Sequence, residues 1–222
     1  MTNNDKQVTE NKAFTAQKAA SPKAKMRARE ITSISLMGAL AFVLMLFKFP
    51  LPFMPPFMDF DFAGVVEMMG GLMFGPLAAF YIIVVKILLK LVIMGTSTAG
   101  TGELQNVLLS CAYVIPAVLI YMRNKTKKTA RIGMGVGTAA ATVVAVLTNL
   151  YLIIPFYATL FGMTMDDIVA MCTAVNPAMK NTVTMVILGI IPFNLIKYGV
   201  SSLVALVLYK HLSRALKSFI QQ

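Results

Sequence analysis

The sequence predicts an all-α, polytopic membrane protein with six transmembrane helices and both termini in the cytoplasm. Of its 222 residues, 58% are hydrophobic and only 13% are charged, whereas soluble domains average about 45–50% apolar and about 25% charged residues. So few polar residues cannot cover a water-facing surface. This composition excludes an ordinary soluble enzyme and a disordered chain, and the apolar residues fall into six separate segments.

The basic residues, which give a net charge of +11, indicate how the chain lies in the membrane. Seven fall within residues 1–30, five within 123–131 and three within 210–217, each group beside an apolar run. Cytoplasmic loops carry such an excess of lysine and arginine, and no soluble recognition domain is present that would indicate a nucleic-acid partner. We expect a flexible basic cytoplasmic tail over residues 1–30, a six-helix membrane domain over 31–210 and a cytoplasmic C-terminal tail over 211–222.

The first three predicted helices are about Ile31–Phe47, Asp61–Phe74 and Leu77–Met94. A helix needs about 20 apolar residues to cross a bilayer, so the second is short unless its flanks extend it. Gly75-Pro76 predicts a tight turn between the second and the third.

The last three predicted helices are about Glu103–Met122, Ile132–Ile154 and Val183–Tyr209. Six crossings put both termini on the same side of the membrane. With the termini inside, the outer connections are Lys48–Phe60, Gly95–Gly102 and Pro155–Thr182. These connections hold few basic residues, in agreement with the orientation that the basic clusters indicate.

Two outer connections have the features of a lid. The first is rich in proline, which stiffens a chain, and exposed phenylalanines are costly, so Phe53, Met54 and Phe57 are expected to cover a ligand. The third connection is about 28 residues long and predicts a short helix over Met165–Ala174, with Thr164 as its N-cap. We therefore expect a covered pocket on the outer face.

Ionisable side chains inside membrane helices are costly, so each marks a candidate site. Glu67 lies in the second predicted helix, and Lys86 and Lys90 share one face of the third. Glu67 and Lys86 either form a buried ion pair that ties two helices or belong to a substrate or proton pathway. Lys90 can instead extend to the outer interface, and Glu103 can simply cap the start of the fourth helix.

Five further polar side chains are candidates for binding a ligand near the outer face. Asn194 and Lys197 lie on one face of the sixth predicted helix, where a lysine and an amide need a shared polar partner, so a ligand role is favoured. Asn149, near the outer end of the fifth, either binds a ligand or makes an interhelical hydrogen bond. Asn106 lies at the outer start of the fourth helix, and Thr98 lies in the glycine-rich connection that is expected to line the pocket.

The sequence lacks the residue sets of common enzymes. It has no phosphate-binding G-x-x-x-x-G-K-[ST] motif. Its one histidine, His211, lies in the C-terminal tail, and Cys111 and Cys172 have no neighbouring ligand residues. We therefore expect no enzymatic activity, no catalytic residue, no metal and no cofactor.

Small residues mark one face of the first predicted helix. Ser35 and Ala39 are four residues apart, a spacing that lets membrane helices approach closely. This face either packs inside the protein or docks on another membrane subunit.

Four stretches resemble one known family. They are Phe49–Asp61, Gly70–Pro76, Gly95–Asn106 and Pro192–Lys197. Together they resemble the riboflavin-specific substrate-binding subunit, or S-component, of energy-coupling factor (ECF) transporters, and the similarity extends over about residues 31–210. The loop motifs carry this resemblance, because hydrophobic helices alone are not specific.

The resemblance implies a riboflavin-binding subunit of an ABC-type vitamin importer in a bacterial plasma membrane. Its implied partners are riboflavin as the transported ligand, a transmembrane coupling subunit, two ABC ATPase subunits and membrane lipid. In this family, amides and a lysine on the last two helices hold the flavin ring, and these correspond here to Asn149, Asn194 and Lys197. The family docks on the coupling subunit through small residues on the first helix, usually two alanines, and here Ser35 replaces the first of them and Ala39 is the second.

The chemistry of the residues agrees with the implied ligand. Riboflavin has a neutral ring with carbonyl and imide edges, which amides and a lysine can bind without a counter-charge, whereas a flavin phosphate would need more cations. The alternatives are an S-component for thiamine, which needs more acids and aromatics, or for folate, which needs more bases. A stand-alone transporter, for which no internal repeat is visible, and an intramembrane enzyme are weaker alternatives.

Overall fold

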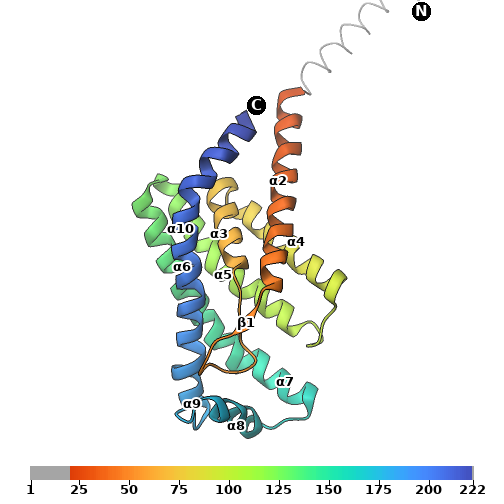
Figure 1. Ribbon diagram of the computed structural model, residues 1–222, viewed down its shortest axis with the longest axis vertical. Helices are drawn as coiled ribbons and strands as arrows, with labels where there is room; N and C mark the ends of the chain where they lie inside the picture. Colours follow the sequence, from red (N-terminus) through yellow and green to blue (C-terminus); the bar gives the residue numbers. More distant parts are fainter. Residues whose placement is uncertain (1–20, 222) are drawn as a thin grey trace, which may run out of the picture.

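The computed structural model describes residues 21–221, and the side chains of residues 28–208. Figure 1 shows an elongated helix bundle in which α2 begins and α10 ends at one end of the molecule, while α8 and α9 lie at the other. The helices are α2 (Ser21–Leu46), α3 (Ala63–Phe74), α4 (Pro76–Met94), α5 (Thr101–Asn124), α6 (Lys127–Thr148), α7 (Ile154–Phe161), α8 (Met165–Val175), α9 (Thr182–Met185) and α10 (Ile191–Gln221). Two π-helices interrupt them, η1 (Asn149–Ile153) and η2 (Val186–Ile190).

Five helical segments of the described chain are long and apolar enough to cross a membrane. They are Ala28–Leu46, Pro76–Met94, Thr101–Asn124, Lys127–Phe161 and Thr182–Leu208. The remaining apolar helix, α3, has only 12 residues, or about 18 Å at the rise of an α-helix, so it does not span a bilayer alone. The predicted segments are therefore all helical, and the second is as short as its sequence indicated.

Helix α3 lies at the centre of the bundle, where every residue from Ala63 to Leu72 is buried. It contacts α2, α4, α5 and α10. Beside it, α6 approaches α5 so closely that a Cβ at Gly133 or Gly137 would overlap the α5 backbone. Such contacts between small residues are a common way for membrane helices to pack.

The fifth predicted helix continues beyond its expected end. The prediction ended it at Ile154 and placed Pro155 in the outer connection, but the chain runs on through η1 and α7 to Phe161. The prediction was wrong because a wide π turn precedes the proline: the N–H of Ile154 donates to the carbonyl of Asn149, and this looser turn accommodates a residue that has no N–H. In the last helix, η2 precedes Pro192 in the same way.

Both terminal helices are longer than the predicted spans. Helix α2 begins at Ser21, well before Ile31, and α10 continues to Gln221. Residues 1–20 of the predicted N-terminal tail, and the side chains of the basic C-terminal residues, lie outside the described residues. Both extensions contain several lysine, arginine and alanine residues, which favour a helix without an apolar environment.

The first outer connection is a short hairpin. Its strands β1 (Phe49–Pro50) and β2 (Asp59–Phe60) pair antiparallel, and an ion pair between Lys48 and Asp59 closes their open end. Near the tip, Phe53 adopts a positive φ of 62° and is 69% exposed. Phe53 was expected to cover a ligand, but in this structure it faces outward.

The third outer connection contains the predicted short helix. Thr164 caps α8, because its hydroxyl accepts a hydrogen bond from the N–H of Asp167. The side chain of Asn176, just after α8, donates to the carbonyl of Phe53 at 3.3 Å. The hairpin and the third connection are thus joined at one end of the bundle, as a covered pocket requires.

Candidate functional site

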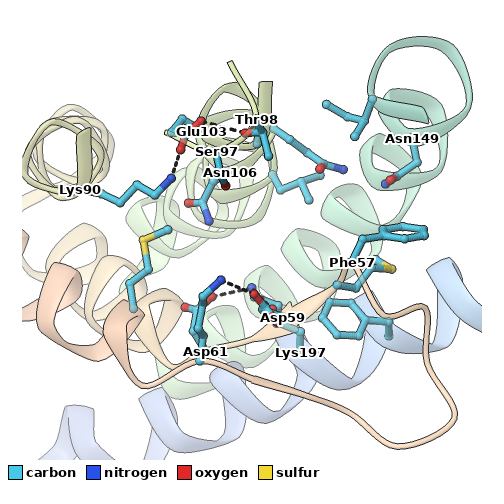
Figure 2. A pocket seen from close by; sticks show the side chains of 18 of the residues that line it. Phe57, Asp59, Asp61, Lys90, Ser97, Thr98, Glu103, Asn106, Asn149 and Lys197 are labelled. Atoms are coloured by element: carbon cyan, nitrogen blue, oxygen red, sulfur yellow. Dashed lines mark hydrogen bonds and ion pairs between the residues drawn. The ribbon is translucent and has the colours of Figure 1, made fainter. Parts of the chain in front are cut away.

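A cavity of about 360 Å³ lies at the end of the bundle that carries the outer connections (Figure 2). Small-molecule sites in proteins usually measure about 300–1,000 Å³. The polar residues that line it are Lys48, Asp59, Asp61, Lys90, Ser97, Thr98, Glu103, Gln105, Asn106, Asn149, Asn194 and Lys197. Apolar side chains including Phe57, Met58, Leu109, Ile153 and Phe193 complete the wall.

The cavity brings together six of the nine predicted ligand residues, namely Asn149, Asn194, Lys197, Phe57, Thr98 and Asn106. They come from the hairpin, the loop before α5, α5 itself, η1 and α10, which are far apart in the sequence. The other three do not line the cavity. Phe53 is exposed, Met54 packs against the core, and Glu67 is fully buried below. The ligand roles of all nine stay predictions.

Lys197 reaches from α10 to the hairpin side of the cavity. Its ammonium group forms an ion pair with Asp61 at 2.6 Å and donates to the carbonyl of Asp59 at 3.1 Å. Burial raises the pKa of Asp61, but the charges of Lys197 and Lys86, with hydrogen bonds from Lys197 and from the N–H of Ala63, together outweigh that effect. The pKa therefore lies below the ordinary value of 3.8. The sequence prediction missed Asp61, although the expected polar partner for Lys197 was the signal for it.

Asn149 and Asn194 offer hydrogen-bond acceptors to the cavity. Asn149 donates from its side chain to the carbonyl of Ala145 at 2.7 Å, and Asn194 donates to that of Ile190 at 2.8 Å. A backbone carbonyl only accepts, so the amide nitrogen faces it in each case. Among the described residues, neither side-chain oxygen has a hydrogen-bond donor. The predicted alternative for Asn149, an interhelical bond, is therefore not what this side chain makes.

The predicted pair of Glu67 and Lys86 is confirmed beneath the cavity. Their side chains are 0% and 1% exposed and form an ion pair between α3 and α4. Lys86 also donates to Asn106 Oδ1 and to Ser110 Oγ, both on α5. The pair thus ties three helices together rather than two.

Lys90 and Glu103 form a second ion pair, between α4 and α5. One expectation was that Lys90 extends to the outer membrane interface, but its ammonium group instead pairs with Glu103. Glu103 does lie in the first turn of α5, and its carboxylate also accepts from the hydroxyls of Thr96 and Thr98 at 3.0 and 3.3 Å. The glycine-rich loop is in this way fixed against the cavity wall.

The charges that line the cavity are balanced. Lys48, Lys90 and Lys197 each pair with one carboxylate, that of Asp59, Glu103 or Asp61 respectively. No lysine of the described lining lacks a carboxylate partner. This arrangement suits a neutral polar ligand better than a strongly charged one, which would have to break a pair.

A second cavity of about 370 Å³ adjoins the first and is almost wholly apolar. Phe57, Thr98 and Tyr157 line both cavities, and Ile168 and Met171 of α8 contribute to the second. The polar site therefore continues into apolar space under the third connection.

The predicted small-residue pair lies on the side of α2 that faces away from the bundle. Ser35 is exposed and Ala39 is half-buried, beside the exposed side chains of Leu36 and Leu40. Ser35 thus takes little part in packing inside the described bundle, where Met37 and Gly38 are buried, while Ala39 is partly covered.

Comparisons with known proteins point in one direction. The model of the family "ECF transporter, substrate-specific component" matches residues 29–209. The riboflavin transporter RibU of Staphylococcus aureus is 33% identical over 190 residues, which cover 85% of this chain and 93% of that protein. The riboflavin transporter FmnP of Bacillus subtilis is 29% identical over 201 residues, covering 89% and 96%. A solved S component of a bacterial ECF transporter matches with a TM-score of 0.69 at 31% identity, covering 86% of this chain and 99% of that one.

Proposed function

Since the chain belongs to the family of ECF transporter substrate-specific components, we propose that it binds riboflavin in the cavity at its outer end and delivers it to an ATP-driven module. Proteins of this family are multi-pass membrane proteins, and this chain is one of the bacterial plasma membrane. Its task is to bind substrate, and hydrolysis of ATP is left to partner subunits. The names of both relatives described above support riboflavin as the ligand.

The observation that carries the proposal is the meeting of Asn149, Asn194 and Lys197 in one cavity. The side-chain oxygens of the two asparagines are acceptors that suit the imide N–H of a flavin ring. Two of the three N–H donors of Lys197 bind Asp61 and the carbonyl of Asp59, and the third suits a ring carbonyl beside that imide. Both kinds of group are needed to bind this edge of the ring.

The charge balance of the cavity supports riboflavin over its phosphate esters. A phosphate group brings about two negative charges near neutral pH, and each cavity lysine is already paired with a carboxylate. The neutral ring and ribityl chain need no such lysine. Phe57 and the adjoining apolar cavity offer surface for the faces and the benzenoid end of the ring.

Ligand binding to the purified protein tests the proposal. The protein, prepared in detergent from riboflavin-producing cells, is expected to be yellow, to release riboflavin on denaturation and to quench the fluorescence of added riboflavin. Thiamine and folate, added in excess, should not displace it. A colourless protein that leaves riboflavin fluorescence unchanged would overturn the proposal and move the search to those vitamins.

Delivery is proposed to proceed through the exposed face of α2. Ser35→Phe adds a bulky side chain to a face that the described bundle does not use. We expect it to abolish riboflavin uptake by cells that hold the complete module, while riboflavin binding by the purified subunit stays unchanged. Leu203→Phe, on an exposed site of α10, is the matched control and should keep both. Uptake by Ser35→Phe at the native rate would contradict docking through this face.

A further inference from the structure

Lys86 is a buried lysine that lies next to the cavity without lining it. Its ammonium group donates to Glu67, to Asn106 Oδ1 at 2.5 Å and to Ser110 Oγ at 3.3 Å. An ammonium group has three N–H donors and no acceptor. The three donors of Lys86 are therefore all in use, and this side chain has none left for a ligand.

Asn106 is the one partner of Lys86 that also lines the cavity. Because lysine can only donate, the atom of Asn106 that faces it must be the carbonyl oxygen. The NH₂ group is then the other end of the amide, and in the described part of the chain it has no hydrogen-bond partner. We infer that Lys86, held by Glu67, fixes Asn106 as a hydrogen-bond donor toward the cavity, so that Asn106 selects ligands with an acceptor at that position.

Turning the amide over is strongly disfavoured. It would break a hydrogen bond to a charged donor and set an NH₂ group against the buried ammonium group of Lys86. Asn149 and Asn194 are fixed the other way, since their nitrogens bind backbone carbonyls. Figure 2 shows Asn106 and Asn149 on different sides of the cavity, and Lys197 on a third. One side thus offers an amide donor and another an amide acceptor, a polarity that a ligand must match.

This inference rests on the proposed function, because riboflavin carries suitable acceptors in its ring carbonyls and ribityl hydroxyls. Asn106→Asp is the sharpest test. The variant keeps an oxygen for Lys86 to bind and has nearly the same shape, but its second oxygen replaces the NH₂ group that faces the cavity. We expect the Kd for riboflavin, measured by fluorescence quenching, to rise at least about tenfold. The reason is that a carboxylate oxygen, which only accepts, then faces an acceptor of riboflavin in place of the donating NH₂ group.

Asn181→Asp is the matched control. Asn181 caps α9 by accepting a hydrogen bond from Thr184, a role that aspartate fills equally well, and it does not line the cavity. Its riboflavin affinity should equal that of the native chain. If Asn106→Asp also binds with native affinity, the donor assignment is overturned. If the native chain itself fails to bind riboflavin, it is the proposed function that has failed.

The positioning role of Lys86 needs a separate readout. Glu67→Leu/Lys86→Met removes both charges together and leaves the Asn106 amide free to turn. Asn106→Leu is expected to weaken binding about tenfold in the native background but less than about threefold in this double variant, because only a fixed donor is lost in full. An equal loss in both backgrounds would show that Lys86 does not set the direction of the amide. Thermal unfolding of each variant without ligand identifies any that fails to fold.

Discussion

The cavity end of the molecule and the packed middle of the bundle each contain a lysine paired with a carboxylate, in different surroundings. Lys197 and Asp61 line the cavity, and Lys197 joins α10 to the hairpin side of the site. Lys86 and Glu67 lie in the middle, closed to solvent and bonded to α5 as well. The comparison teaches that the same chemical pair can serve binding where it meets a cavity and can serve stability where it is enclosed.

Lys86→Met should have the largest effect of all. It leaves the carboxylate of Glu67 buried without its cation, and breaking a buried ion pair in this way costs about 3–5 kcal/mol. Thermal unfolding of the purified protein in detergent, without riboflavin, measures the loss. The double variant Glu67→Leu/Lys86→Met removes both charges and should recover most of the stability. If Lys86→Met has the melting temperature of the native protein, the enclosed pair does not stabilise the fold, and the distinction between the two regions is wrong.

Lys197→Ala comes second and should act on affinity instead. We expect riboflavin binding to weaken by about 1–3 kcal/mol, because a ring acceptor loses its donor. Asn194→Ala, which removes an acceptor for the imide N–H, should weaken it to a similar extent. The melting temperature should fall less than in Lys86→Met, since Asp61 borders an open cavity and can be hydrated. Lys180→Ala, at an exposed lysine outside the cavity, is the control. Unchanged affinity in both cavity variants would refute the site assignment.

Low pH should break the ion pair of Asp61 and Lys197 by protonating Asp61, with a smaller effect than either substitution above. The pKa of Asp61 in the folded protein lies below 3.8, because the charges of Lys197 and Lys86 and the hydrogen bonds to its carboxylate together outweigh the effect of burial. A lowered carboxyl pKa contributes stability above the unfolded value, and that contribution disappears as the pH falls through the folded value. The free energy of unfolding of the ligand-free protein should therefore keep this contribution from neutral pH down to about 4 and lose it only below that.

Asp61→Asn is the control for this pH profile. It has no carboxylate to protonate, so any decline that remains in the variant comes from other groups. A decline between pH 6 and about 5 that the native chain shows and Asp61→Asn lacks would contradict the lowered pKa.

The sequence predicted the middle of the molecule better than the cavity end. Apolar runs identify the helices, and Glu67 and Lys86 stand out in them because charge is costly there. Asn149, Asn194 and Lys197 stand out for the same reason. The cavity itself depends on how the irregular segments fold. Hydrophobic periodicity says nothing about the path of a loop, so Phe53 and Met54 were placed less well than Phe57.

Two other features of the cavity end could not be read from local sequence. The π turn before Pro155 looks like the end of a helix, because proline normally ends one. Asp61 looks like the first residue of the second predicted helix, and only the three-dimensional contact with Lys197 reveals its role. The first depends on a local widening of the helix, and the second on a contact between segments that are far apart in the chain.

Thr164→Ala should have the smallest effect and tests how far the cavity end extends. The Thr164 hydroxyl caps α8, and loss of such a cap costs about 1 kcal/mol. A loss of this size should make hydrogen exchange of the α8 amides about fivefold faster. The amides of α6, in the packed middle, should keep their protection. Thr159→Ala, which removes only a bond from Thr159 to the preceding turn of α7, is the matched control.

Because α8 supplies Ile168 and Met171 to the apolar cavity, we also expect a small loss of riboflavin affinity. Faster exchange spread evenly over α6 and α8 would mean that the two regions unfold as one unit, and the contrast between them would then describe contacts rather than stability.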